Sequence, residues 1–366
     1  MPCPRASRAA PCRARFSATS ASSAATSIRR APSRASSSRL APTTATAVLS
    51  ALLTGQDDEA LVRSAPVPTG FDVLDTALGG GINATELLLL GGLPGVGKTI
   101  AAIQIARNLA RDGRDVVYAC YEHTTGDLLA RLLLLELGEE ADALDPHLEL
   151  LRDVVRTSMV EPDALRELVD REPLLQAAIE RMRDYTDRLW LVAASGAHTG
   201  VEELAALVDE HLPQGGLLVV DYLQKVSVRP EPSDETEKVT RIAEGLKELA
   251  LSSRIAVIAI AAADRRALDA PRLRLHHLRG SSALAYEADV AIILNDKFQI
   301  LSKVHLAYDT AQAEGARNFV VFSVEKNRGG PALVDLEFRK TFTHYRFGSQ
   351  GAYVRERLVD ERLNVE

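Results

Sequence analysis

The stretch GLPGVGKT at residues 92–99 restricts the fold more than any other part of this chain. It fits the pattern G-x-x-x-x-G-K-[ST] at every fixed position, and loops of this pattern wrap phosphate groups with their backbone N–H groups. A short apolar run at residues 86–90 precedes it, and residues 100–106 have the apolar spacing of a helix. Strand, loop and helix therefore come in the order that a phosphate-binding loop needs. The alternative, a chance match in a glycine-rich turn, would require no such order.

Lys98 is expected to reach the β- and γ-phosphates of a bound nucleotide, and Thr99 is expected to give its hydroxyl to Mg²⁺, which prefers oxygen ligands. The glycines let the backbone approach the phosphates closely, and the helix that starts near Lys98 directs the positive end of its dipole at the same charge. The sequence therefore predicts ATP and Mg²⁺ as cofactors. The residues expected to bind the nucleotide are Gly92, Pro94, Gly95, Val96, Gly97, Lys98 and Thr99.

The composition is that of a soluble globular protein over most of the chain. Of the 366 residues, 46% are hydrophobic and 25% are charged, and the formal net charge is −7. Cys3, Cys12 and Cys120 have neither metal-ligand spacing nor an even count, which fits a reducing compartment and a cytoplasmic location. Because no apolar run approaches the roughly 18 residues of a membrane helix, no membrane association is expected.

The first part of the chain differs from the rest in charge. Its first 56 residues contain eight arginines and no lysine, aspartate or glutamate, whereas the remainder is acidic. Residues 1–47 are rich in Ala, Ser, Arg and Pro, and we expect them to be disordered. A transit peptide, a basic arm for nucleic acid and translation of an unused frame also fit this composition. Residues 48–66 are expected to form a leader helix and linker that either docks on a neighbouring subunit or frays at the surface.

Two carboxylates each follow a short apolar run, as side chains at the ends of buried parallel strands do. Glu122 follows residues 116–121 and is expected to polarise the attacking water of a hydrolytic site, with a solvated strand-end acid as the alternative. Asp221 ends the run at residues 217–221, which has the form of a Walker B strand. It is expected to hold Mg²⁺ opposite Thr99.

Several segments together resemble the DnaB-like helicases of superfamily 4, and more distantly the RadA and KaiC ATPases. They are the lead-in at residues 68–82, the strand, glutamate and helix around Glu122, the sequence VDYLQ at residues 220–224 and the turn VEKNRGGP at residues 324–331. The resemblance spans about residues 68–347. It implies a RecA-like α/β domain over residues 67–366, in which a mainly parallel central sheet is flanked by helices and a C-terminal β-hairpin region follows. It does not include the helical amino-terminal domain through which replicative DnaB helicases bind primase.

The resemblance also implies a function. Residues 326–328 match the family's K-x-R motif, whose arginine reaches the nucleotide bound by the neighbouring subunit. The implied protein is an ATP-hydrolysing DNA helicase motor that serves DNA replication or repair, binds single-stranded DNA and forms a homo-oligomer, namely a hexameric ring. The implied catalytic residues are Lys98, Glu122, Lys326 and Arg328.

A basic segment follows the strand that is expected at residues 255–261. Its charge pattern, with few acids, suits contact with a DNA backbone, although a solvated basic loop is the alternative. At Ala262 the family carries a glutamine that senses the γ-phosphate, and a methyl group cannot do this. Two other interpretations therefore stay open: a KaiC- or RadA-like regulatory or recombination ATPase, and a nucleotide-binding module with weak hydrolysis. The residues expected to bind DNA are Arg265, Arg266, Arg272, Arg274 and Arg279.

Overall fold

The computed structural model describes residues 44–54, 66–140, 151–155, 162–301, 314–356 and 358–359. The chain divides into two compact units between Val62 and Arg63. The first unit contains helix α1 (Ala45–Thr54), which begins just before residue 48, where the leader is expected, and which exposes its Leu53 side chain. Residues 1–43 of the expected tail and residues 55–65 of the expected linker lie outside the described residues.

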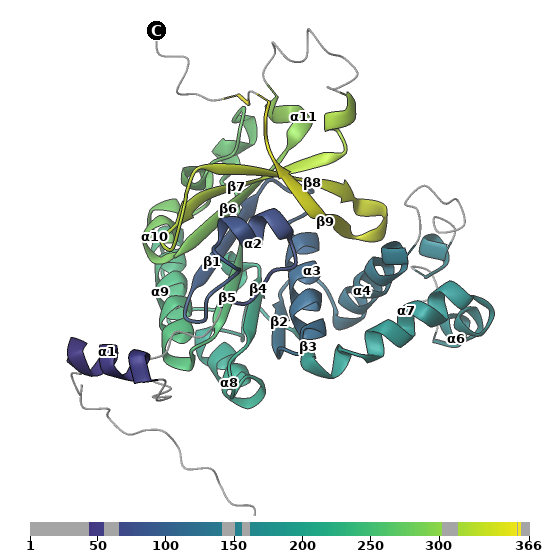
Figure 1. Cartoon of the computed structure of the whole chain (residues 1–366), viewed down its shortest axis with the longest axis horizontal. Coiled ribbons are helices and arrows are strands. Elements are labelled where there is room, and N and C mark those ends of the chain that lie inside the picture. The colour runs from purple at the N-terminus through teal and green to yellow at the C-terminus, as the bar shows by residue number, and fades with distance from the viewer. Residues whose placement is uncertain are drawn as a thin grey trace, which may run out of the picture. The chain divides into compact units, whose positions relative to one another are not determined.

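The second unit is built on one nine-stranded sheet with the strand order β3-β2-β4-β5-β1-β6-β7-β8-β9 (Figure 1). The strands from β3 to β6 in this order run parallel, and β7, β8 and β9 continue the sheet in antiparallel fashion. The mainly parallel sheet with C-terminal hairpins that the sequence predicts is thereby confirmed. The strands are β1 (Leu87–Gly92), β2 (Val116–Cys120), β3 (Leu189–Ala193), β4 (Leu217–Asp221), β5 (Ala256–Ala262), β6 (Val290–Asp296), β7 (Phe319–Asn327), β8 (Val334–Thr341) and β9 (Arg346–Tyr353).

Helices cover both faces of the sheet (Figure 1). Helices α2, α3, α4, α6 and α7 pack into the core on one face, and α8, α9 and α10 pack into the core on the other. Residues 125–187 contain α4, α6 and α7, while residues 141–150 and 156–161 lie outside the described residues. The helices are α2 (Asp72–Ala77), α3 (Lys98–Arg111), α4 (Thr125–Glu140), α6 (Pro162–Arg171), α7 (Pro173–Arg183), α8 (Val201–His211), α9 (Glu235–Ser253), α10 (Ser281–Glu287) and α11 (Lys297–Ile300).

The apolar sequences of the inner strands follow from their burial. Every residue of β1, β2 and β4 is buried, as expected where helices cover both faces of a parallel sheet. At the antiparallel end, Phe71 of the lead-in packs edge-on against Phe338, with ring centroids 5.1 Å apart. Phe322 and Phe347 complete this aromatic cluster. The cluster holds the lead-in against the C-terminal strands.

The lead-in also anchors the helix of the phosphate-binding loop. The backbone N–H and the hydroxyl of Thr69 both donate to Asp75 Oδ1, each at 2.7 Å. Asn108 on α3 donates to the Thr69 carbonyl oxygen at 2.9 Å. Gly70 has a φ of +81°, and a Cβ there would lie 2.3 Å from Asn108 Nδ2, so only glycine fits. The threonine-glycine turn therefore serves to seat α3.

Most expected elements occur near their expected bounds. Helix α9 begins at Glu235, because Asp234 accepts a hydrogen bond from the Glu237 backbone N–H at 3.1 Å and caps the helix. Strand β9 has no counterpart among the expected elements, since its sequence RFGSQGAY lacks an apolar run. None of the described helices is both long and apolar enough to cross a membrane.

Candidate nucleotide site

The phosphate-binding loop lies between the end of β1 and the start of α3. Gly97 caps α3 in a left-handed conformation with φ at +103°, and a Cβ there would lie 2.6 Å from Phe342 Cζ. Gly95 is also left-handed, with φ at +79°, and forms the exposed tip of the loop with Pro94, while Val96 is buried. The first N–H groups of α3 thus lie beside a short turn, where they can bind an anion.

Lys98 is folded back over its own loop. Its Nζ donates to the Gly92 carbonyl oxygen at 2.8 Å and to the Leu93 carbonyl oxygen at 2.9 Å. Burial lowers the pKa of Lys98 to about 8, although the charges of Asp221 and Glu122 act in the opposite direction. A phosphate beside this ammonium group would favour the charged form. The environment of Lys98 therefore fits an anionic ligand.

Asp221, the last residue of β4, is surrounded by hydroxyl groups. The Tyr118 hydroxyl donates to Asp221 Oδ2 at 2.9 Å. Burial raises the pKa of Asp221, while the hydrogen bonds from Tyr118 and Thr99 lower it. Thr99 and Asp221 thus place a hydroxyl oxygen and a carboxylate oxygen together, which fits Mg²⁺. No local pattern in the sequence identifies Tyr118 as a partner of Asp221, because Tyr118 lies 103 residues earlier in the chain.

Glu122 is exposed just beyond β2, and its Oε1 lies 3.6 Å from Lys225 Nζ. Lys225 ends a short 3₁₀ helix (Leu223–Lys225) that follows Asp221. Sequence reasoning does not identify this partner, although the basic residue directly after the DYLQ sequence is a signal. Because the two side chains are 41% and 42% exposed, solvent weakens their attraction.

The register of the sheet brings these groups to one edge. Asp221 pairs with the last residue of β2, and Ala262 at the end of β5 pairs with Gly92 at the end of β1. All of them lie at the carboxyl ends of parallel strands, where ligands bind in open α/β sheets. We call this region the nucleotide edge, formed by Lys98, Thr99, Glu122 and Asp221.

Gln224 fastens the segment after β4 to the end of β5. The Ala262 N–H donates to Gln224 Oε1 at 3.1 Å, and Gln224 Nε2 lies 3.5 Å from the Ala262 carbonyl oxygen. The same Nε2 lies 3.4 Å from the Arg279 carbonyl oxygen, and the Arg279 N–H donates to the Ala262 carbonyl oxygen at 3.1 Å. A glutamine amide of the neighbouring segment therefore links Ala262 to the basic segment that follows β5.

Lys326 and Arg328 lie at the opposite end of the sheet. Strand β7 ends at Asn327, which pairs with the first residue of β6, whereas Gly92 pairs with Leu294 further along β6. At about 3.3 Å per residue, this register separates Arg328 from the start of the phosphate-binding loop by more than ~10 Å along the strands. Within one chain, the structure therefore does not bring Lys326 and Arg328 to the nucleotide edge.

Both cations are held near the carboxyl end of α10. Lys326 Nζ donates to the carbonyl oxygens of Ala285 and Ala288, at 2.6 and 2.5 Å. Burial, and after it the charge of Arg328, lowers the pKa of Lys326. Arg328 Nη1 donates to Asp289 Oδ1 at 3.1 Å, and the arginine side chain is 52% exposed. We call this region the hairpin edge, formed by Lys326, Arg328 and Asp289.

The basic segment after β5 is not an exposed patch throughout, and this corrects the expectation for Arg272. The Arg272 side chain is 4% exposed, donates to Ser323 Oγ at 3.0 Å and pairs with Asp335. It anchors the segment to β7 and β8. The sequence does not show this, because these partners lie 51 and 63 residues further along the chain. The side chain of Arg266 lies outside the described residues.

The other arginines of the segment are more accessible. Arg274 pairs with Glu325 at 2.8 Å and Arg279 pairs with Glu235 at 2.9 Å, and the two arginine side chains are 20% and 32% exposed. Arg265 is exposed. Acidic residues from β7 and α9 thus neutralise part of the charge that the sequence alone assigns to this segment.

Known proteins resemble this chain over most of the second unit. A family model described as "DnaB-like helicase C terminal domain" matches residues 66–347. The replicative DNA helicase DnaB of Treponema pallidum (strain Nichols) is 27% identical over 282 residues, which cover 76% of this chain and 55% of that protein. The DNA repair protein RadA of Mycobacterium tuberculosis (strain CDC 1551 / Oshkosh) is 29% identical over 164 residues, which cover 43% of this chain and 33% of that protein. The chain spans about half the length of the DnaB relatives that it matches.

Solved structures share the fold. A structure described as an "ATPase Domain" matches with a TM-score of 0.63 and 19% identity, over 84% of this chain and 99% of the other. A structure described as "The Structure Of A DnaB-Like Replicative Helicase And Its Interactions With Primase" matches with a TM-score of 0.61 and 19% identity, over 84% of this chain and 67% of the other. The architecture is therefore that of a RecA-like helicase ATPase domain.

Proposed function

Because the chain belongs to the family of DnaB-like helicase C-terminal domains, we propose that it is a motor ATPase that hydrolyses Mg-ATP between copies of itself and acts on single-stranded DNA. The observation that carries this proposal is the division of the expected catalytic groups between two opposite ends of one sheet. The nucleotide edge has groups suited to bind phosphate and metal, and the hairpin edge presents a half-exposed arginine that pairs with Asp289 and lies away from the nucleotide edge of its own chain.

At the nucleotide edge, each side chain has a role that its surroundings support. Lys98 would exchange the two loop carbonyls for the β- and γ-phosphates, and Thr99 and Asp221 would hold Mg²⁺. Glu122, which is exposed beside this pair, would accept a proton from the attacking water. Bound Mg-ATP supplies the phosphoryl group that is transferred to water.

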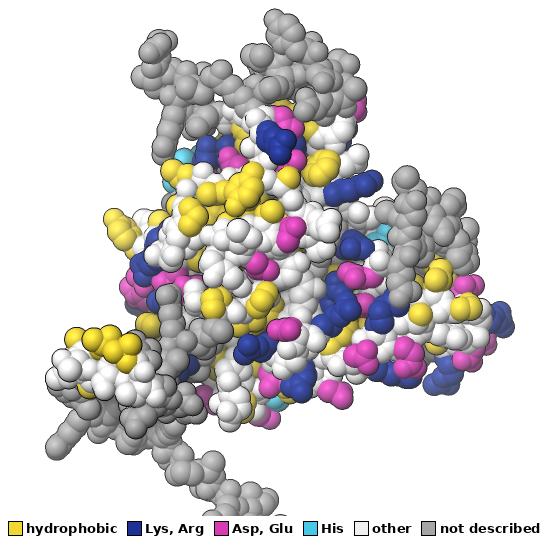
Figure 2. Space-filling model, in the orientation of Figure 1, with side chains coloured by type: hydrophobic (Ala, Val, Ile, Leu, Met, Phe, Trp, Pro, Cys, Tyr) yellow, Lys and Arg dark blue, Asp and Glu magenta, His cyan; other side chains and the backbone are white. Residues whose placement is uncertain are grey.

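A second copy placed head to tail would bring Arg328 to the site. Exposed apolar side chains near Arg328 support such a contact: Tyr286 and Leu333 are 75% and 61% exposed. Figure 2 shows hydrophobic side chains gathered on the surface over the antiparallel strands. Head-to-tail contacts close into a ring when the rotation between copies allows it, and we propose a hexameric ring.

For single-stranded DNA, we propose phosphate contacts from the basic segment, which begins directly after Ala262 and so lies next to the nucleotide edge. Arg272 is not among them, because it is buried. Opening the ion pairs of the accessible arginines would let them contact DNA phosphates and release counterions. The residues that we propose for DNA contact are Arg265, Arg266, Arg274 and Arg279.

The test is the rate of ATP turnover with and without a single-stranded oligonucleotide, with Glu122→Gln as the reference variant. We expect DNA to raise the turnover of the natural sequence. Glu122→Gln should still bind Mg-ATP but should hydrolyse it about 10²-fold more slowly, because an amide keeps the shape of the side chain but cannot accept the proton. Equal turnover in the two proteins would remove Glu122 from the mechanism.

A second function is favoured by one observation, the methyl group of Ala262 beside the phosphate-binding loop. Without a polar side chain there, nucleotide binding would be coupled only weakly to DNA. The chain would then act as a nucleotide-dependent assembly module with weak hydrolysis, or as a RadA-like ATPase. ATP-dependent assembly in sedimentation experiments, together with turnover that DNA does not change, would select this second function.

A further inference from the structure

Asp289 joins several elements at the hairpin edge. It is only 6% exposed. Its Oδ2 accepts hydrogen bonds from the Leu87 N–H at 2.8 Å and from Lys247 Nζ at 2.7 Å. Its Oδ1 accepts from Arg328 Nη1 at 3.1 Å, and its carbonyl oxygen accepts from the Arg328 backbone N–H at 2.9 Å. One buried carboxylate therefore connects the start of β1, helix α9 and the turn after β7.

We propose that Asp289 is the positioning residue of Arg328, which it holds so that the guanidinium projects toward the phosphates bound by the next copy of the chain. This inference rests on the proposed function. A guanidinium has five N–H donors in one plane. Arg328 uses Nη1 on Asp289 and Nη2 on the Tyr286 carbonyl oxygen, and these two contacts fix the plane. The other donors remain for a phosphate.

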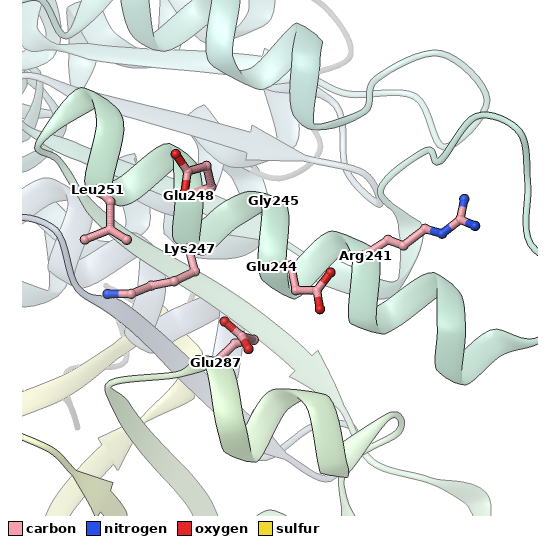
Figure 3. A pocket seen from close by; sticks show the side chains of 7 residues that line it. All are labelled: Arg241, Glu244, Gly245, Lys247, Glu248, Leu251 and Glu287. Carbon is pink, nitrogen blue, oxygen red and sulfur yellow. The ribbon is translucent and has the colours of Figure 1, made fainter. Parts of the chain in front are cut away.

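Cationic side chains surround the Asp289 carboxylate. Lys247, Lys326 and Arg328 place three cations near two carboxylates, those of Asp289 and Glu287. Lys247 and Glu287 also line an open groove of about 550 Å³ between α9 and α10 (Figure 3). Figure 3 shows Lys247 extending from α9 while Glu287 stands at the end of α10 that faces it. Arg241, Glu244 and Glu248 line the same groove, so the groove itself carries no excess of positive charge. The half-exposed guanidinium of Arg328 is the group at this edge that offers donors to an anion.

The substitution Asp289→Asn tests the assignment with little change in volume. The amide oxygen can still accept at one of the two carboxylate positions, but the new NH₂ group must take the other, where it faces either Arg328 or the Leu87 N–H and Lys247, all of which are donors. We expect kcat for ATP to fall by about 10- to 100-fold, because a misplacement of ~1 Å can cost on the order of 10²-fold. The ATP concentration for half-maximal rate should change little, since Arg328 acts mainly on the transition state. Asp209→Asn, the same substitution on the exposed face of α8, is the matched control.

Mixing subunits separates positioning from a general folding defect. An Asp289→Asn subunit keeps an intact phosphate-binding loop, and a Lys98→Ala subunit keeps an intact hairpin edge. A mixture of the two should therefore regain turnover at the interfaces that combine both intact halves, as a mixture of Arg328→Ala and Lys98→Ala subunits should. The double variant Asp289→Asn/Arg328→Ala should be no slower than Arg328→Ala alone.

The proposal for Asp289 is overturned if Asp289→Asn keeps or raises turnover while Arg328→Ala loses it. It is also overturned if Asp289→Asn loses turnover that mixing does not restore, although Arg328→Ala is restored, or if the double variant is slower by the product of the two single effects. If Arg328→Ala itself keeps full turnover, the shared site fails, and the role of Asp289 fails with it. The Arg328→Ala result therefore distinguishes failure of the proposed function from failure of the inference.

Discussion

The two ends of the sheet hold their charged side chains in different ways. At the nucleotide edge, Lys98 donates to two carbonyls of its own loop, and Glu122 shares an ion pair in which both partners are about 40% exposed. At the hairpin edge, the carboxylate of Asp289 is buried and accepts from three donors. Contacts of the first kind are easily exchanged for a ligand, whereas contacts of the second kind fix a geometry. One edge is suited to rearrange around a nucleotide, and the other is suited to present a rigid group.

Removing one cation from each edge should separate their roles most clearly. Lys98→Ala should weaken ATP binding by about 2–5 kcal/mol, because the phosphates would lose a buried, hydrogen-bonded charge. Arg328→Ala should leave ATP binding nearly unchanged but lower turnover by about 10³-fold, as expected for an arginine that stabilises charge in the transition state. Titration with a fluorescent ATP analogue measures the first effect, and phosphate release measures the second.

The distinction between the edges would be lost if Arg328→Ala weakened ATP binding as much as Lys98→Ala does. The natural control is Arg339, a residue of β8 with an exposed side chain. Arg339→Ala removes the same side chain from another strand and should change neither binding nor turnover.

Local sequence patterns predict one edge better than the other. The phosphate-binding loop and the acids at or just beyond the ends of β2 and β4 are each contained in a few consecutive residues, so motif and apolar run identify them together. By contrast, Asp289 accepts from Leu87, which lies 202 residues earlier, and Arg272 donates to Ser323, which lies 51 residues later. Such partners depend on the register of distant strands. A pattern within one strand or one loop contains no information about that register.

The same dependence on distant strands explains why the sequence does not distinguish the arginines of the basic segment from one another. The sequence shows five arginines that look alike, but the fold buries Arg272 and leaves Arg265 exposed. Burial of Arg272 requires Ser323 and Asp335 to lie on adjacent strands, which no local pattern shows. The parallel sheet itself is well predicted, because β1, β2 and β4 are apolar over most of their length and a glycine or an acid stands at or just beyond the end of each.

Two substitutions in the basic segment should have different effects. Arg272→Gln should lower the free energy of unfolding by about 3 kcal/mol, because it removes one partner of a buried ion pair and leaves Asp335 without its cation. Arg265→Gln should leave stability unchanged and should reduce the slope of log K for single-stranded DNA against log salt by about 0.7, the value for one lost phosphate contact on a single strand. Chemical denaturation measures the first effect, and DNA binding over a range of salt concentrations measures the second. A reduced salt slope in a stably folded Arg272→Gln protein would show that Arg272 leaves its buried position to bind DNA.

The affinity for ATP should depend on pH through Lys98. This dependence distinguishes the nucleotide edge from the hairpin edge. Burial lowers the pKa of Lys98 to about 8. ATP binds the charged form, so the affinity should be nearly constant below pH 8 and should fall by up to about ten-fold per pH unit above it. Titrations from pH 7 to pH 9.5 at constant ionic strength measure this decline. Asp289→Asn should show the same decline in ATP affinity, since Asp289 lies at the hairpin edge. If the affinity of the natural sequence stays constant up to pH 9.5, Lys98 remains charged in its buried position.

The smallest expected effect concerns Ala262, which lies between the nucleotide edge and the basic segment. Ala262 pairs with Gly92 at the start of the phosphate-binding loop, and its carbonyl oxygen accepts from the Arg279 N–H at 3.1 Å. Its N–H donates to Gln224 Oε1. A glutamine side chain at this position would add a polar group next to the loop without removing these backbone contacts.

Ala262→Gln should therefore raise the stimulation of ATP turnover by single-stranded DNA about five-fold, at the lower end of the usual range for coupling between two sites. Ala206→Gln, on the exposed face of α8, introduces the same side chain away from both edges and is the matched control. The ratio of turnover with and without DNA is the measured quantity, because it cancels differences in the amount of active protein. If the ratio does not rise, residue 262 is not the point at which the nucleotide and the basic segment communicate. The hydrogen bonds of Gln224 to Ala262 and Arg279 would then be the remaining connection between them, and Gln224→Ala should lower the same ratio.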